Sequence, residues 1–143
     1  MNEKETIYAV IDTNVLVSSL FSANGESNPS RVIKAVLNGT ITALYNNDII
    51  EEYRDVLSRD KFNFSSELIE NLLSVFTEFG INSARTDASD EIFTDSDDIV
   101  FYEIALSVDD AYLVTGNTKH FPIKPFVVTP TQMVEILANR GLI

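Results

Sequence analysis

Short apolar runs, each of the length of a buried β-strand, alternate along the chain with segments that carry helix signals. Residues Tyr8–Ile11 form the first run and are apolar on both faces of an extended chain, which is typical of a strand covered on both sides. The sequences ITALY, AYLVT and FVVT give three more runs, at residues 41–45, 111–115 and 126–129. Strands that alternate with helices predict an α/β fold, a three-layer α/β/α sandwich around a central, mainly parallel sheet.

Helix start and stop signals fill the segments between these strands. Asn and Ser caps, a proline in the first turn and a glycine after the last turn are typical of helix ends. No internal repeat or long linker interrupts the alternation, so we expect a single domain over residues 1–143. The predicted helices run from Asn28 (as cap) and Pro29 to Gly39, from Asn46-Asn47-Asp48 to Leu57, from Ser65 or Ser66 to Gly80, from Ser96-Asp97-Asp98 through Val108, and from Pro130 onward.

The composition excludes several other classes of protein. With 143 residues, 45% of them hydrophobic, the chain is long enough to bury a core without disulfides. No apolar run approaches the roughly 18–20 residues of a membrane span, and the polar first six residues show no signal peptide. The absence of cysteine excludes thiolate metal sites and favours the cytoplasm.

Negative charge dominates the chain, which has 22 Asp and Glu residues against 10 Lys and Arg residues and a formal net charge of −12. A surface of this sign repels nucleic acid through space and attracts basic peptides or proteins. Contact with RNA or DNA would therefore require cations, or a few basic residues, concentrated at the binding site.

The first strand ends on an acid, Asp12, at the edge of a buried core. A carboxylate is unfavourable there unless something positive compensates it. A helix N-cap and an ion pair with a nearby arginine are two structural explanations, and a functional site is the third. Parallel α/β sheets bind ligands outside the carboxyl ends of their strands, so the other acids that reach this edge decide between the explanations.

Several oxygen-bearing side chains are predicted to reach that edge, because they follow strands or open helices there. No equal number of basic residues accompanies them in the sequence. Such a cluster is unstable without cations, and Mg²⁺ or Mn²⁺ are the hard cations that oxygen ligands hold. The residues are Asp12 after the first strand, Glu51 and Glu52 in the helix after the second, Asp97 and Asp98 before the next strand, and Asn117 after it.

Each of these residues also has a purely structural interpretation. Asp97 and Asp98 fit the positive end of a helix dipole, Glu51 and Glu52 fit a solvated helix face, and the lone His120 fits a surface or capping position. The stretch from Thr86 has no glycine where a calcium-binding loop would need one. Its acids are expected in a solvated loop: Asp87, Asp90, Glu91 and Asp95.

Three stretches in a fixed order carry a resemblance to a known family. They are IDTNVLVSSL, IIEEYRDVLSR and DSDDIVFYEIALSVDDAYLVTGNTKHF. Together they resemble the PIN-domain family, and more closely its small bacterial branch of toxins from toxin–antitoxin pairs, over nearly the whole chain. The resemblance implies a PIN-like α/β sandwich and metal-dependent endoribonuclease activity with one or two Mg²⁺ or Mn²⁺ ions.

Carried over by position, the resemblance implies Asp12, Glu52, Asp98 and Asn117 as the catalytic and metal-binding residues. The fourth position is often aspartate in the family, and asparagine is a departure from that pattern. An amide oxygen coordinates a metal without bringing charge, so the site would carry about three negative charges. This departure weakens the case for a second ion more than the case for the first.

Other residues of the same motifs are expected to support the acids. Thr13, Asn14 and Thr115 are candidates to orient the carboxylates, and Lys119 is a candidate to meet a substrate phosphate. The resemblance further implies an RNA substrate, a basic antitoxin protein as partner and the option of a homodimer, with no membrane association.

Two rival functions remain open on the sequence alone. A strand that ends in Asp also opens the aspartyl-phosphate phosphatases, but those related to haloacid dehalogenases need a second Asp two residues on, where this chain has Asn14. The other rival is a PIN-like module that is catalytically weak or inactive and binds only a partner or RNA. Asn117 is the one feature that supports it.

Overall fold

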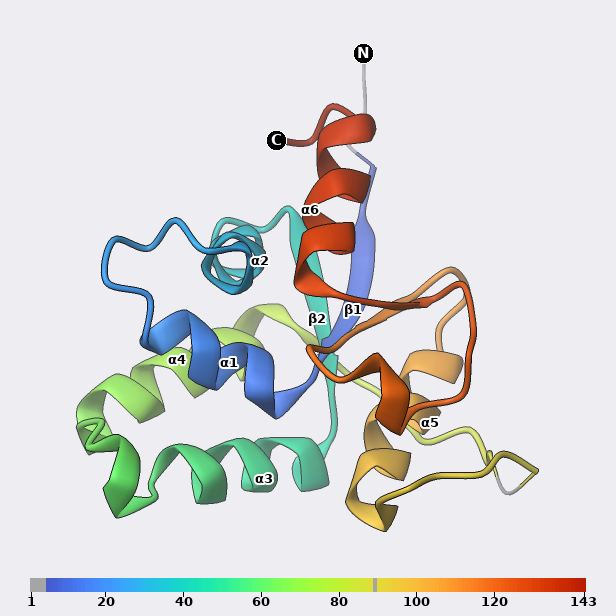
Figure 1. Ribbon diagram of the computed structural model, residues 1–143, viewed down its shortest axis with the longest axis horizontal. Coiled ribbons are helices and arrows are strands. Elements are labelled where there is room, and N and C mark those ends of the chain that lie inside the picture. The colour runs from blue at the N-terminus through green and yellow to red at the C-terminus, as the bar shows by residue number, and fades with distance from the viewer. Residues whose placement is uncertain (1–4, 89) are drawn as a thin grey trace.

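The computed structural model describes residues 5–88 and 90–143. Its strands form one five-stranded, entirely parallel sheet in the order β3-β2-β1-β4-β5, with β1 in the centre (Figure 1). The predicted α/β class and central parallel sheet are confirmed. The strands are β1 (Ile7–Ile11), β2 (Ile41–Tyr45), β3 (Ile81–Asn82), β4 (Tyr112–Val114) and β5 (Val127–Val128).

Six α-helices in the described ranges cover the two faces of the sheet (Figure 1). One layer contains α1 (Thr13–Leu20), α2 (Asn28–Leu37) and α6 (Pro130–Asn139). The other contains α3 (Asn47–Leu57), α4 (Ser66–Phe79) and α5 (Ile99–Leu106). Short 3₁₀ turns lie at η1 (Asp60–Phe62), η2 (Ser96–Asp98) and η3 (Thr118–His120). The predicted three-layer sandwich is therefore confirmed.

The core lies on both faces of β1 and explains why this strand is apolar throughout. Ala9, Val10 and Ile11 have no exposed surface. The buried Tyr53 of α3 donates its hydroxyl hydrogen bond to the Ile11 carbonyl, and so fixes α3 against the end of the central strand. Within the described residues, no helix is both long and apolar enough to cross a membrane.

The starts of α3 and α4 follow the predicted capping residues, and α6 begins at Pro130 as predicted, while the cap of α2 is a correction. Asn46, Ser65 and Thr129 cap α3, α4 and α6, each through a side-chain oxygen that accepts a backbone N–H. The cap of α2 is Ser27, and the prediction that Asn28 caps this helix is wrong. Ser27 has the extended backbone of a cap and accepts from Ser30 N, while the Asn28 amide donates to Thr131 Oγ1 at 2.8 Å.

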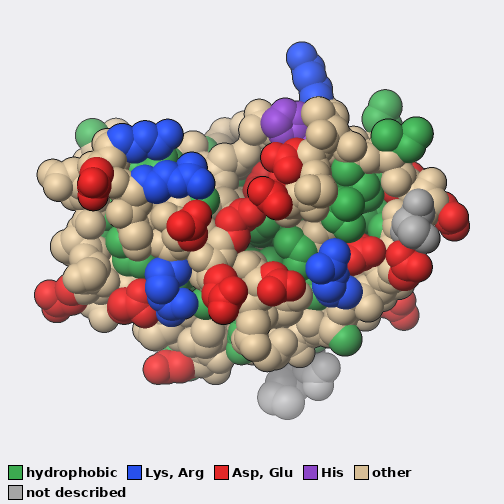
Figure 2. All heavy atoms as spheres, turned by 90° about the horizontal axis from the view of Figure 1, so that it is seen from below, with side chains coloured by type: hydrophobic (Ala, Val, Ile, Leu, Met, Phe, Trp, Pro, Cys, Tyr) green, Lys and Arg blue, Asp and Glu red, His purple; other side chains and the backbone are tan. Residues whose placement is uncertain are grey.

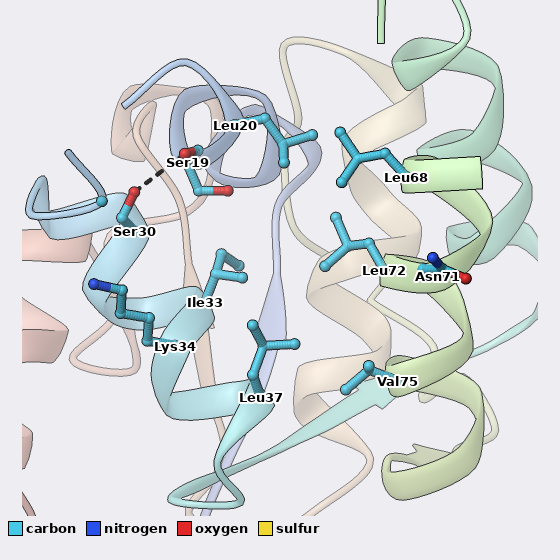
Figure 3. Close-up of a pocket in the computed structure, with 11 residues that line it drawn as sticks. Ser19, Leu20, Ser30, Ile33, Lys34, Leu37, Leu68, Asn71, Leu72 and Val75 are labelled. Carbon is cyan, nitrogen blue, oxygen red and sulfur yellow. Dashed lines mark hydrogen bonds between the residues drawn. The ribbon is translucent and has the colours of Figure 1, made fainter. Parts of the chain in front are cut away.

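A separate apolar hollow of about 370 Å³ lies between α1, α2 and α4. Leu20, Ile33 and Leu37 face Leu68 and Leu72 across it (Figure 3). The two helices on one side are joined where the Ser30 hydroxyl donates to the Ser19 carbonyl at 3.1 Å. None of the predicted site residues lines this hollow.

Candidate functional site

The candidate site lies at the carboxyl ends of β1 and β4, which the second turn of α3 and the start of α5 also approach. Asp12 follows β1, and its backbone N–H donates to the Val114 carbonyl of β4 at 2.9 Å. This bond continues the β1–β4 pairing and holds Asp12 at the sheet edge. Its side chain is nearly enclosed, with 7% of the residue exposed.

Neither structural explanation accounts for Asp12. It occupies the N-cap position of α1, yet its side chain makes no capping hydrogen bond. Within the described residues no Lys or Arg forms an ion pair with it. Its Oδ2 instead accepts a 2.7 Å hydrogen bond from the buried Thr115 hydroxyl, and burial raises the pKa of the Asp12 carboxyl above its usual 3.8.

Glu52 approaches the same edge from the second turn of α3. Its carboxylate accepts a hydrogen bond from the Thr13 hydroxyl at the first residue of α1. Burial raises the pKa of Glu52, and the negative charges of Asp12, Asp97 and Asp95 raise it further, against the lowering effect of the Thr13 bond. Thr13 and Thr115 thus donate to Glu52 and Asp12, respectively.

Asp98 approaches the site from the end of η2, just before α5, and its pKa is shifted further than the pKa values of the other two acids. Its side chain is 17% exposed, and burial with the charges of Asp12 and Asp95 raises its pKa from 3.8 to about 6. The Oδ2 atom is fully enclosed and has no hydrogen-bond partner in the described structure. His120 Nδ1 lies 3.7 Å away, beyond hydrogen-bonding distance.

The surface beside these three residues is acidic and hollowed. A hollow of about 440 Å³ is lined by Asp48, Glu51, Glu52, Asp55, Ser96, Asp97, Val100 and Arg85. Figure 2 shows acidic side chains gathered across the middle of this face. Arg85 is held by Glu103 at 2.6 Å and lies 3.9 Å from Asp48, so it does not neutralise the candidate acids.

Asn117 lies next to the site, but its side chain is not joined to the acids. Its backbone N–H donates to Thr115 Oγ1 at 3.0 Å, the same hydroxyl that donates to Asp12. The residue is exposed and lines a different hollow with Asn14. Asn14 Oδ1 accepts from the Gly116 N–H at 3.2 Å, so this asparagine fixes the loop after β4, and within the described residues it forms no hydrogen bond with a carboxylate.

The three acids fit a divalent cation by their chemistry. Among the described residues, no three Asp, Glu, His or Cys side chains are placed so that they could all hold one ion. Asp98 nonetheless keeps an enclosed, unpartnered carboxylate oxygen, and burial with mutual repulsion raises the pKa of Asp12, Glu52 and Asp98. A hard cation bound between them would offset both penalties.

Several residues that shape the site were missed or misjudged from sequence. Glu103 is an enclosed acid inside the apolar run of α5 and accepts from Arg85 Nε and from the Ala88 N–H at 2.7 Å. The sequence signal that could have identified Glu103 is a single acid inside an otherwise apolar helix. Asp95 and Glu91 lie in a loop at the surface, as expected, but each also has a local partner that the sequence did not indicate: Asp95 accepts from the Asp97 N–H at 2.9 Å, and Glu91 pairs with Lys124 at 3.2 Å.

A comparison with known families gives one match. The family model described as PIN domain matches residues 8–119, a range that includes Asp12, Glu52, Asp98 and Asn117. No curated protein and no solved structure matches the chain.

Proposed function

Because the chain belongs to the PIN-domain family, whose fold is of the nuclease type, we propose that it is a metal-dependent endoribonuclease that hydrolyses RNA phosphodiesters. The observation that carries the proposal is the enclosed Asp98 Oδ2, which has no hydrogen-bond partner among the described residues, beside two further acids that form no ion pair with a described Lys or Arg. A protein that used these acids only for packing would leave them destabilising its native state.

In this proposal Asp12, Glu52 and Asp98 hold one Mg²⁺ or Mn²⁺ ion. The bound cation supplies Lewis-acid stabilisation of the charge that develops on the phosphate. Thr115 and Thr13 keep the Asp12 and Glu52 carboxylates in fixed orientations through their hydrogen bonds, which is the role that outer residues have around metal ligands.

Asn117 is proposed as an uncharged contributor at the rim of the site. Three carboxylates leave one positive charge uncompensated when two divalent ions are present, so a second ion would bind weakly until a substrate phosphate arrives. The support is the backbone position of Asn117, whose N–H donates to the same Thr115 hydroxyl that donates to Asp12.

A titration of Mn²⁺ and Mg²⁺ against a fluorogenic RNA tests the function. Cleavage should need the metal and be lost in Asp12→Asn and Asp98→Asn, because each variant replaces a negatively charged carboxylate that would hold the ion with a neutral amide. Asp109→Asn is the matched control, since Asp109 is an exposed acid beyond the opposite end of α5. Metal-independent cleavage, or equal activity in all four proteins, would refute the proposal.

The same experiment separates the two rivals. An aspartyl-phosphate phosphatase would hydrolyse a phosphomonoester, which the proposed endoribonuclease leaves intact. A module without catalysis would cleave neither substrate at any metal concentration, although it could still bind RNA.

We also propose that the protein is the toxin of a toxin–antitoxin pair and acts in the cytoplasm as a single domain over residues 1–143. The formal net charge of −12 would draw a basic antitoxin, whose association would slow as salt screens it. An adjacent reading frame that encodes a small basic protein would support this role, and growth unaffected by expression of the chain alone would contradict it. Size measurement in solution decides whether the protein is a homodimer.

A further inference from the structure

Three phenylalanines form a partly exposed aromatic cluster at the far ends of α1 and α3. Phe21 directly follows α1, Phe62 ends the η1 turn after α3, and Phe64 comes two residues later. The Phe21 ring centroid lies 5.7 Å from that of Phe62 and 5.2 Å from that of Phe64. Phe62 and Phe64 stack at 5.7 Å with only 14° between their planes.

Phe21 is the most exposed ring of the cluster, whereas Phe62 and Phe64 are half-buried. Phe21 is 58% exposed, so a large part of its ring faces solvent. Asn63, between the two stacked rings, has a left-handed backbone with φ of 54°, which costs energy for any residue except glycine and is tolerated best by asparagine and aspartate. The chain accepts this conformation, and Phe62 and Phe64 stay partly exposed on either side of Asn63.

The ammonium group of Lys61 lies on this cluster. Lys61 Nζ lies 5.0 Å from the Phe62 ring centroid, and within the described residues Lys61 forms no ion pair. Most other basic residues in the described part of the chain pair with a carboxylate at 2.5–3.9 Å. They are Arg54, Arg59, Arg85, Lys124 and Arg140. In a chain of net charge −12, this unpaired ammonium over aromatic rings favours a ligand that carries both negative charge and flat apolar groups.

The aromatic cluster is connected to the acidic site by two helices. α1 begins directly after Asp12 and ends before Phe21, and α3 carries Glu52 and leads to Phe62. The eight residues of α1 span about 12 Å, a distance that a few nucleotides of extended single strand cover. α1 and α3 run in the same general direction from the sheet edge (Figure 1), and Figure 2 shows basic side chains over an apolar area at the left of the acidic face.

We infer that Phe21, Phe62 and Phe64, together with Lys61, form a platform on which bases of single-stranded RNA stack, a few nucleotides away from the phosphate at the acidic site. The inference rests on the proposed function for the RNA class. Bases of any sequence stack on aromatic rings, and a lysine beside them meets the backbone phosphate. The platform supplies attraction at a distance from acids that repel the same strand.

Binding without cleavage tests the platform separately from catalysis. The probes are a fluorescein-labelled 12-nucleotide oligoadenylate and an abasic RNA of the same length and charge, in low salt with Ca²⁺ as the only divalent cation. Fluorescence anisotropy should show the oligoadenylate bound at least about fivefold tighter by the wild type, the smallest effect expected for one stacked base. The double variant Phe21→Leu/Phe62→Leu should lose most of this difference, because leucine keeps the apolar contact and removes the ring face.

Two control variants separate stacking from general effects. Phe79→Leu removes another exposed ring, 72% accessible at the end of α4, and should leave the ratio of the two affinities unchanged. Lys61→Glu, at an exposed position, should weaken both oligonucleotides alike, since it acts on the phosphates. Lys61→Glu keeps all three rings, so it tests the phosphate contact of the platform even if the double variant melts earlier than the wild type, and unchanged binding of both oligonucleotides would remove Lys61 from the platform.

Equal binding of the two oligonucleotides by the wild type would overturn the inference, and so would an unchanged ratio in a folded double variant. A double variant that changes only self-association or peptide binding would assign the aromatic cluster to a protein partner and also overturn it. A protein that prefers the oligoadenylate but never cleaves RNA would support the platform and refute the nuclease proposal.

Discussion

Replacing Asp98 with asparagine should stabilise the metal-free protein. The folded state raises the pKa of Asp98 from 3.8 to about 6, so its carboxylate opposes folding at neutral pH. Taken in full, that change corresponds to about 3 kcal/mol, at about 1.36 kcal/mol for each tenfold change in the ionisation constant. Solvent screens a side chain that is partly exposed, so we expect Asp98→Asn to add about 1–2 kcal/mol to the free energy of unfolding in EDTA at pH 7.

The sign of the pH dependence follows from the same pKa. Between about pH 4 and pH 6 the folded state binds more protons at Asp98 than the unfolded state, so wild-type stability falls as the pH rises through this range. The variant lacks this group and should lose less stability over the same range. Burial also raises the pKa of Asp12 and Glu52, so part of the slope should remain.

Urea unfolding followed by circular dichroism measures this effect, first in EDTA and then in excess Mn²⁺. A cation that binds only the folded wild type at a hundredfold excess over its dissociation constant adds about 2.7 kcal/mol, so the order of stability of wild type and Asp98→Asn should reverse. Asp109→Asn should follow the wild type in both buffers. A variant less stable than the wild type in EDTA would show that the Asp98 charge is compensated in the native state and would refute the reasoning.

Three further predictions concern neighbours of the acids. Asn117→Asp should lower the Mn²⁺ concentration needed for half-maximal RNA cleavage and Asn117→Ala should raise it; coincident rate curves would remove this residue from the metal site. Thr115→Val should weaken Mn²⁺ binding about 10–100-fold, measured by calorimetry, because Asp12 loses the hydrogen bond that orients it; unchanged affinity would contradict that role. Arg85→Met should lower the free energy of unfolding by about 1–3 kcal/mol, since Glu103 keeps an enclosed charge without its partner; Glu103→Gln in the same background should recover part of the loss.

The central strands could be predicted because burial on both faces leaves a direct trace in sequence. Every residue of Ile7–Ile11 and Ile41–Tyr45 must be apolar or nearly so to lie inside a three-layer sandwich. The edge strand β3 leaves no such trace, since it has two residues and both are exposed. Its pairing with β2 is decided by where α4 returns the chain and not by its composition.

The helix α1 was missed for a different reason. It begins at Thr13, immediately after Asp12, with no turn residue between strand and helix and no side-chain cap at its start. Its sequence therefore reads as a continuation of the preceding apolar run. The same direct junction places Asp12 at the sheet edge and Thr13 beside Glu52, so the feature that hides the helix also builds the site.

Which acids stay without basic partners is a tertiary property that the sequence does not show. Arg54 and Arg59 are the basic residues nearest to Glu52 in the chain, but in the fold they pair with Glu70 at 2.9 Å and with Asp55 at 3.6 Å. Had either turned toward Glu52, the raised pKa of that carboxyl would have been lowered and its need for a cation removed. The spacing of the acids locates the candidate site. The placement of the basic side chains elsewhere is what leaves Asp12, Glu52 and Asp98 with a net negative charge that a metal ion could neutralise.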